Sequence, residues 1–441
     1  GPYKAMRGFL DARSWAALVL VFQFADAFLA PSAFPFRSVV GSRPSMRRPH
    51  CLVTLRSQAQ DGLTRRQVLA ATGLQVAGLA FYSKPALAGD VPQAPTDRPR
   101  NIVITGSNSG IGKDAAVKLA AGGYNIYLAC RTKAKGEAAR KEILDQVETM
   151  KKGGLPAGEV VAMECDLASL KSIRQFAADW KALGKSLDVL VCNAGLSLST
   201  AAKPPPPTTA DGFEITVGTN HLGHFLLCNL LLPELERSPD PHPRIVITAS
   251  QVHDPESAGG NVGSKATLGN MDGLAKGSGW EMVDGGAFDG DKAYKDSKLC
   301  NVLFTREMQR RLSDRGSKVT CNSFSPGLIT RSGLFRDQNP IFVGLFDFIV
   351  YNVAHVAETV DFGGGCLVTM AVGPQLEGKG AEFWSNSKPG QHTFEKVEVS
   401  KEAQDAAKAR RLWELSARAV GLTPAETIVL NAAARAHEAF T

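Results

Sequence analysis

Asn101-Ile102-Val103-Ile104-Thr105-Gly106-Ser107-Asn108-Ser109-Gly110-Ile111-Gly112 is the stretch that decides the fold of this chain. Its first five residues form an apolar, β-branched run, which is typical of a buried parallel strand. A helical stretch, residues 113–121, follows the glycines. A strand, a glycine turn and a helix N-terminus together form an anion site, because free N–H groups and the helix dipole face the anion. The TGxxxGxG spacing in this context predicts dinucleotide binding, since glycine lets the backbone approach a pyrophosphate closely.

The alternation of strands and helices continues along the chain. Further strands are predicted at residues 125–129, 160–165, 187–191 and 245–248. Such alternation predicts an α/β fold of the doubly wound Rossmann type, a mostly parallel sheet with helices on both faces. We expect a single domain over residues 98–422, followed by a C-terminal tail at 423–441.

Two turns at strand ends add to the predicted nucleotide site. Asp166-Leu167 and Asn193-Ala194-Gly195 lie at the carboxyl ends of predicted strands, where doubly wound sheets bind ligands. Arg131 follows another strand, at the point where NAD-binding proteins place an acid for the ribose 2′-hydroxyl. A basic residue there accommodates a 2′-phosphate, so Arg131 and the nearby Lys135 predict NADPH. The alternative is an ordinary surface arginine.

Tyr294 and Lys298 are the candidate catalytic pair. Their i, i+4 spacing places them on one face of a predicted helix. A lysine ammonium beside a phenol favours the phenolate, so we expect the pKa of Tyr294 to be lowered toward the working pH. Tyr294 could then exchange a proton during hydride transfer, while Lys298 holds the nicotinamide ribose. The pair is informative because it follows the glycine turn, the Asn-Ala-Gly turn and the strand-end Ser250 in that order.

Composition excludes other classes of function. The chain has a net charge of +7, but the excess of basic residues lies in residues 1–88, which hold eleven Lys and Arg and only three acids. The rest of the chain holds 39 basic and 40 acidic residues and is nearly neutral. A nucleic-acid partner therefore loses its main support. The eight cysteines are scattered without metal-ligand spacing, so no metal is predicted. His221 and His224 lack an evident third ligand, and ordinary packing or hydrogen bonding is expected of them.

The N-terminal segment is interpreted as three targeting signals. Residues 1–27 show an arginine-bearing start, an apolar run and a small-residue end, typical of a signal peptide, with residues 1–5 extraneous. Residues 28–63 have transit-peptide composition. Residues 64–88 open with a twin arginine and end on small residues, typical of a twin-arginine signal; an amphipathic piece of transit peptide is the alternative.

The order of the catalytic motifs resembles the short-chain dehydrogenase/reductase family. The resemblance implies that Ser250, Tyr294 and Lys298 are catalytic, that Asn220 completes a proton relay, and that Pro326 lies beside the nicotinamide. The expected cofactor contacts are Gly106, Ser107, Asn108, Gly110, Ile111, Gly112, Arg131, Lys135, Asp166, Leu167, Asn193, Ala194, Gly195, Tyr294, Lys298 and Pro326.

Further stretches narrow the resemblance to the light-dependent NADPH:protochlorophyllide oxidoreductases. They are residues 212–225, 252–290, 293–301, 333–336 and 408–415. Residues 252–290 form an insertion between Ser250 and Tyr294 that ordinary short-chain members lack, and we expect it to border the substrate cleft. In that family NADPH gives hydride to one carbon of the C17=C18 bond of the light-excited pigment. The proton for the other carbon is attributed to the tyrosine or a relay behind it.

The resemblance also implies a location and a cleft. The junction at residues 27–31 resembles that of algae with complex plastids, so a thylakoid-associated plastid protein is expected, on the stromal or the lumenal side. Peripheral membrane attachment and a homo-oligomer are compatible with this. The pigment needs a large apolar cleft. Leu334, Phe335 and the run 341–351 are a candidate lid; plain core or a membrane-facing helix is the alternative for that run.

The sequence departs from the family pattern in the expected cleft. Gly195 stands where the family has Ala, Ser197 where it has Tyr, Val252 where it has Thr, and Leu328 where it has Cys, whereas Cys300 is retained. The candidate substrate contacts are Ser197, Val252, Cys300, Leu328 and Phe335. Two alternatives therefore stay open: a dark NADPH-dependent carbonyl reductase of a plastid lipid or other hydrophobic substrate, and a non-catalytic pigment- or NADPH-binding thylakoid partner. The Tyr/Lys pair disfavours the latter, and the insertion disfavours the former.

Overall fold

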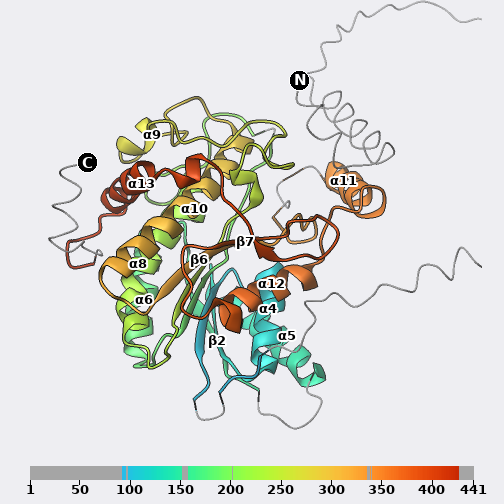
Figure 1. The fold of residues 1–441 in the computed structure, drawn as a ribbon, viewed down its shortest axis with the longest axis vertical. Coiled ribbons are helices and arrows are strands. Elements are labelled where there is room, and N and C mark those ends of the chain that lie inside the picture. Colours follow the sequence, from blue (N-terminus) through green and yellow to red (C-terminus); the bar gives the residue numbers. More distant parts are fainter. Residues whose placement is uncertain are drawn as a thin grey trace, which may run out of the picture. The chain divides into compact units, whose positions relative to one another are not determined.

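The sheet grows outward from the strand that precedes the glycine turn. In the computed structural model the strand order is β3-β2-β1-β4-β5-β6-β7-β8 (Figure 1). The strands are β1 Asn101–Thr105, β2 Asn125–Cys130, β3 Val160–Glu164, β4 Val189–Cys192, β5 Arg244–Thr248, β6 Thr320–Ser325, β7 Phe383–Ser385 and β8 Glu395–Lys396. All neighbours pair in parallel except β7 and β8. The order reverses between β1 and β4, so the predicted doubly wound sheet is confirmed.

The structure describes residues 92–95, 98–150, 157–200, 202–334, 338 and 340–426. The three predicted targeting segments lie outside the described residues, as does most of the predicted tail. No helix within the described residues is long and apolar enough to cross a membrane.

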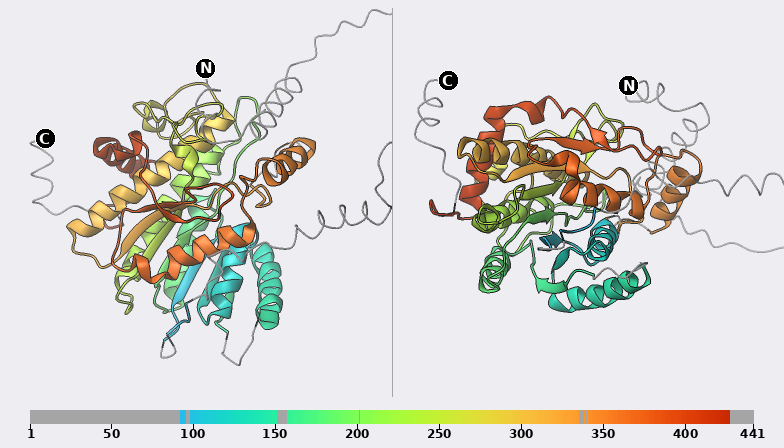
Figure 2. Two further views of the ribbon diagram at one scale, coloured as in Figure 1. Left: turned by 45° about the vertical axis from the view of Figure 1, so that its right-hand side comes forward. Right: turned by 60° about the horizontal axis from the view of Figure 1, so that its bottom comes forward.

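Helices cover both faces of the sheet (Figure 2). One face carries α4 Gly110–Ala121, α5 Lys133–Met150 and α12 Val360–Val372; the other carries α6 Leu170–Ala182, α8 Gly223–Glu236 and α10 Gly290–Asp314, with α13 Ala406–Ala419 packed on α8 and α10. The remaining helices are α7 Ile215–Val217, a π-helix at Gly218–Leu222, α9 Asp272–Ala275, α11 Pro340–Asn352, and 3-10 turns at Gln251–His253, Pro374–Leu376 and Glu402–Gln404.

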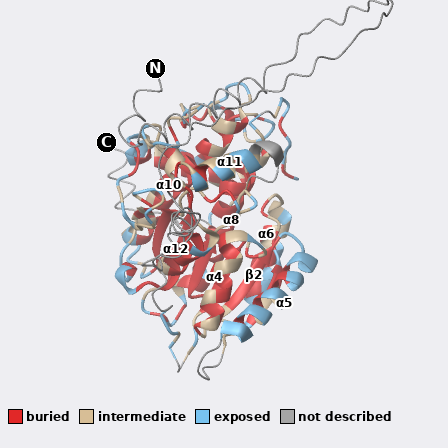
Figure 3. Ribbon diagram, turned by 90° about the vertical axis from the view of Figure 1, so that its right-hand side faces the viewer, coloured by how far each residue is buried: buried red, intermediate tan, exposed pale blue. Residues whose placement is uncertain are grey.

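Successive side chains of a strand point to opposite faces of the sheet, so the strands contribute to two hydrophobic cores. Along β1, Val103 joins the core beneath α6, α8 and α10, whereas Ile102 and Ile104 join the core beneath α4 and α12. All five β1 residues are buried, as expected for a central parallel strand covered on both faces. Figure 3 shows the same layering, with buried strands and an α5 that turns an exposed face outward.

Some boundaries differ from the sequence prediction. The helix expected from Lys113 begins at Gly110, because the end of the glycine turn is already helical. The strand expected from Leu187 begins at Val189. The short strands β7 and β8 were not predicted, since three and two residues carry too little periodicity to be recognised.

Candidate active site

The glycine turn forms a cradle at the N-terminus of α4. Gly106 and Gly110 adopt φ angles of +65° and +56°, a left-handed conformation that favours glycine. A Cβ on Gly112 would lie 2.5 Å from Asn193 Nδ2 and 2.9 Å from the Gly106 carbonyl oxygen. The N-cap residue Ser109 makes no side-chain capping hydrogen bond, so the first N–H groups of α4 are left for a ligand. The cradle therefore fits a pyrophosphate.

The Thr105 hydroxyl joins this cradle to the turn after β4. Its Oγ1 accepts hydrogen bonds from the N–H groups of Asn193 at 2.8 Å and Ala194 at 2.9 Å. The Asn193 side chain donates back to the Thr105 carbonyl at 3.0 Å. The predicted cofactor residues of β1 and β4 are therefore brought together, and Thr105, which the sequence reasoning did not single out, is the residue that holds them.

His224 supports Thr105 from beneath. Its Nδ1 lies 3.0 Å from the Asn220 carbonyl, which can only accept, so Nδ1 carries the proton and Nε2 accepts from the Thr105 hydroxyl at 2.9 Å. Burial lowers the pKa of His224 to about 4, which keeps the ring neutral. His221 is buried against Phe225 and Phe304, with Nε2 2.9 Å from Ser416 Oγ. The predicted packing and hydrogen-bonding roles of both histidines are confirmed.

Asn220 lies in the π-helix and uses its whole amide. The Oδ1 atom accepts from the Leu196 N–H at 2.9 Å, and Nδ2 donates to the Leu196 carbonyl at 2.9 Å and to Ser297 Oγ at 3.0 Å. Asn220 thus clamps the loop that follows Gly195 to helix α10. Its predicted relay role stays a prediction.

Tyr294 and Lys298 lie on α10, as predicted, with Lys298 Nζ 5.4 Å from the centre of the Tyr294 ring. Lys298 Nζ donates to the Thr248 carbonyl at 3.1 Å, and Asn301 Nδ2 donates to the same oxygen at 3.3 Å. These bonds tie α10 to the end of β5, two residues before Ser250. The pair, Ser250 and the glycine turn therefore share the carboxyl edge of the sheet.

The expected lowering of the Tyr294 pKa is wrong for the protein alone. Burial raises the pKa of Tyr294, and it lowers the pKa of Lys298 to about 8. Desolvation disfavours both charged forms, and the hydrogen bond of Lys298 goes to Thr248. Tyr294 is therefore a neutral phenol at neutral pH, the form in which it can donate a proton.

Four of the predicted cofactor residues, Arg131, Lys135, Asp166 and Leu167, follow the ends of β2 and β3. Arg131 is exposed, with Nε 4.0 Å from Asp166 Oδ1. Asp166 also accepts from the Ala168 N–H at 3.0 Å. Leu167 packs beneath α8, where a Cβ on Gly223 would lie 2.5 Å from its carbonyl oxygen. Lys135 is exposed on the first turn of α5, so two exposed cations follow β2.

The turn after β6 covers the cradle. Its residue Ser332 packs against Gly110, whose Cβ would lie 3.6 Å from Ser332 Cα. Behind the turn that contains Pro326, the Glu358 N–H donates to the Leu328 carbonyl at 2.8 Å. The Gln251 side chain donates to the Asn386 carbonyl at 2.9 Å, which links the segment after Ser250 to the end of β7.

The predicted substrate contacts that the structure describes differ in how far they are buried. Ser197 and Val252 are half-buried near the Gly195 and Ser250 segments, and Leu328 bridges to Ala357. Cys300 is 0% exposed inside the core, behind the catalytic face of α10. Phe335 lies outside the described residues.

Gly195 lies beside Asn220 of the π-helix and Lys298 of α10. A Cβ there would lie 3.4 Å from Asn220 Oδ1 and 3.7 Å from Lys298 Nζ, which are ordinary contacts. An alanine would therefore fit, and glycine leaves a small space beside the lysine.

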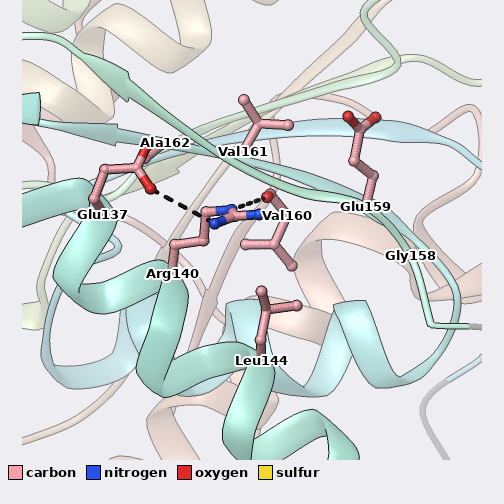
Figure 4. Close-up of a pocket in the computed structure, with 8 residues that line it drawn as sticks. All are labelled: Glu137, Arg140, Leu144, Gly158, Glu159, Val160, Val161 and Ala162. Carbon is pink, nitrogen blue, oxygen red and sulfur yellow. Dashed lines mark hydrogen bonds and ion pairs between the residues drawn. The ribbon is translucent and has the colours of Figure 1, made fainter.

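A hollow of about 460 Å³ lies elsewhere, along the edge strand β3 and helix α5 (Figure 4). Arg140 Nε donates to the Val160 carbonyl at 2.8 Å across it. None of the predicted site residues lines this hollow, and the arginine covers part of the open strand edge.

Comparisons with known proteins agree with this geometry. Residues 100–272 match the short chain dehydrogenase family. The chain is 41% identical over 349 residues to "Protochlorophyllide reductase, chloroplastic" of Chlamydomonas reinhardtii, covering 78% of this chain and 83% of that protein. It is 42% identical over 331 residues to the protein of the same name from Cucumis sativus, covering 74% and 79%.

Among solved structures, a putative uncharacterized protein from Mycobacterium Paratuberculosis is 31% identical with a TM-score of 0.53, covering 75% of this chain and 96% of that one. The glycine cradle, the Tyr294/Lys298 pair and the extent of these matches together lead to one assignment. The chain belongs to the protochlorophyllide reductase family of short-chain dehydrogenases.

Proposed function

We propose that this protein catalyses the light-driven, NADPH-dependent reduction of the C17=C18 bond of protochlorophyllide to give chlorophyllide. The observation that carries the proposal is the position of the half-buried Tyr294 phenol. Tyr294 lies beside Lys298 on α10, and Lys298 ties this helix to the end of β5, two residues before Ser250. The same edge of the sheet holds the glycine cradle. The relatives that bear the name of this activity match most of the chain.

Each group has its own role in the proposed reaction. NADPH bound in the cradle supplies the hydride, and absorbed light supplies the driving force. The Tyr294 Oη holds a proton at neutral pH because burial raises its pKa. That proton passes to the C17=C18 carbon that does not receive hydride, and the resulting phenolate is stabilised by the Lys298 ammonium. Thr105 and Asn193 keep the cradle in place during the step.

Helix α11 is the part of the chain that we propose to cover the pigment. Leu345 and Phe348 are 49% and 58% exposed, so this helix is not the plain core that the sequence allowed. Asp347 fastens it to the turn after β6 through Thr330 and through Arg331, whose Nη2 lies 3.0 Å away. An apolar helix fastened beside the cofactor turn suits a lid over an apolar substrate; attachment to a membrane surface is the alternative for the same face.

Plastid location is part of the proposal. The relatives are named chloroplastic, and the N-terminal 88 residues carry the composition of successive targeting signals. We propose a protein of the thylakoid surface on this basis.

NADPH affinity should fall as the pH rises through about 8. Burial lowers the pKa of Lys298 in the free protein to about 8, and the ammonium is the form that can donate to the ribose, so binding takes up a proton above that pH. Fluorescence titration in the dark should show a loss approaching about tenfold per pH unit above the midpoint. Lys298→Met should bind NADPH more weakly and with a flat profile. A flat wild-type profile across pH 8 would contradict this role.

Arg131→Ala should weaken NADPH binding and leave NADH binding unchanged. A charge-assisted hydrogen bond contributes about 1.5–3 kcal/mol, which corresponds to roughly 10- to 100-fold in affinity. The matched control is Arg237→Ala, which removes another exposed arginine, at the end of α8. Equal losses for both cofactors, or none, would mean that Arg131 does not contact the 2′-phosphate.

The function itself is tested by a flash of light. The full chain is mixed with NADPH and protochlorophyllide, and the red absorption band is recorded in darkness and after illumination. A chlorophyllide band should arise only after light, and Tyr294→Phe should lower its yield per flash by roughly 10²- to 10⁴-fold, the usual contribution of a general acid. Turnover of simple ketones in darkness, with no pigment conversion, would instead identify a carbonyl reductase.

A further inference from the structure

Of the three residues between Tyr294 and Lys298, two contact the inserted segment 252–290. Lys295 Nζ donates to the Ser264 carbonyl at 2.8 Å and also to the Val262 carbonyl. Asp296 Oδ1 accepts from the Thr267 N–H at 2.9 Å. The motif that carries the catalytic pair therefore also carries two anchors for the insertion.

Neighbouring charges on α10 complete the attachment. Lys292 Nζ donates to the Thr267 carbonyl at 2.8 Å and pairs with Asp296 at 2.5 Å and Asp284 at 2.9 Å. Asp291 accepts from the Ser264 N–H at 2.9 Å and pairs with Lys295 at 2.9 Å. Each of these four side chains makes at least one hydrogen bond to a main-chain group of the insertion, so together they hold the path of the segment.

The C-terminal elements hold the same segment from another side. Glu402 accepts from the Leu268 N–H at 2.9 Å and pairs with Lys408 at 2.6 Å. Arg411 Nε donates to the Asn270 carbonyl at 2.9 Å. Figure 1 shows the insertion, with α9, over the N-terminal end of α10 and close to α13. Residues 262–270 are thus fixed between two helices.

Burying the charges of these anchors costs desolvation free energy, which indicates that they serve to position the segment. Lys295 is 4% exposed and Asp296 is 0% exposed. Buried ion pairs lose much of their attraction to desolvation, and apolar packing of similar volume stabilises a fold at least as well. Charges at these positions therefore define where the segment lies more than they add to stability.

The segment so held adjoins the reacting residues at both ends. It begins two residues after Ser250, and Asp289 near its end caps α10 by accepting from the N–H groups of Asp291 at 2.9 Å and Lys292 at 3.0 Å. A Cβ on Gly290 would lie 2.9 Å from the carbonyl oxygen of Ser199, in the loop that follows the cofactor turn. A shift of the insertion would therefore displace the residues next to Ser250 at one end and those before Tyr294 at the other.

We propose that Lys295 and Asp296 are positioning residues that hold the inserted segment in register with Tyr294 and so set how protochlorophyllide is presented to its hydroxyl. The inference rests on the proposed function, which supplies the substrate. Residues on α10 thus have two different roles. Tyr294 and Lys298 take part in the reaction, whereas Lys295 and Asp296 hold the inserted segment in place.

The test compares Lys295→Met with its conservative counterpart Lys295→Arg, which can still donate to the two carbonyls. Asp296→Asn is a milder second variant, because it keeps an acceptor for the Thr267 N–H and loses only the charge. The matched control is Lys401→Met. It removes a lysine 3.9 Å from Glu256 of the same insertion, but that pair is 93% and 77% exposed.

Lys295→Met should raise KM for the pigment by about tenfold or more, with kcat and NADPH affinity changed by less than about threefold, since a small displacement of a substrate wall is costly. Hydrogen–deuterium exchange of residues 262–268 should become faster in the dark. Asp296→Asn should shift both readouts the same way by less, Lys295→Arg should restore most of both, and Lys401→Met should alter neither.

Unchanged exchange in residues 262–268, or an unchanged pigment KM, in Lys295→Met would overturn the inference. Faster exchange throughout the domain together with lost NADPH binding would also overturn it, because the role would then be general stability. If the wild-type protein converts no pigment, the proposed function fails separately, and the exchange measurement still decides whether these residues anchor the segment.

Discussion

The hydrogen bonds of the Thr105 hydroxyl are the interaction on which the site depends. Thr105 ends β1, and its Oγ1 accepts from the two N–H groups that begin the turn after β4. These are the strands between which the strand order reverses, so one hydroxyl fixes the width of the crevice where a dinucleotide lies. The neutral His224 ring accepts a hydrogen bond from that hydroxyl and thereby fixes the direction of its O–H bond.

The same chain of contacts reaches the catalytic helix. His224 donates to the carbonyl of Asn220, whose side chain clamps Leu196 and reaches Ser297 on α10. From the other side, Lys298 and Asn301 hold the Thr248 carbonyl at the end of β5. The glycine cradle and the helix that carries Tyr294 are therefore connected through hydrogen bonds, and neither can shift alone. The π-helix at Asn220 is the local irregularity that makes this geometry available.

The sequence predicted the parts that local pattern determines. The strand 101–105, the glycine turn, the parallel α/β architecture and the shared face of Tyr294 and Lys298 follow from periodicity and spacing, and the structure agrees with them. That Thr105 joins the two cofactor turns, and that His224 hydrogen-bonds to it, was not predicted, because each contact spans more than eighty residues of sequence. The pKa of Tyr294 was predicted in the wrong direction, since burial depends on the whole fold and outweighs the nearby ammonium. The anchoring roles of Lys295 and Asp296 were missed for a related reason: their partners are main-chain groups of an irregular segment.

The central claim is that NADPH held in the cradle gives a hydride, and Tyr294 a proton, to the same double bond. The direct measurement is mass spectrometry of the product formed in light from protochlorophyllide and NADPH deuterated at C4 of the nicotinamide. The account predicts a product one deuterium heavier than that formed with unlabelled NADPH, and a second added deuterium when the reaction is run in D₂O. A product that forms without deuterium from the cofactor, or that forms equally in darkness, would contradict the account.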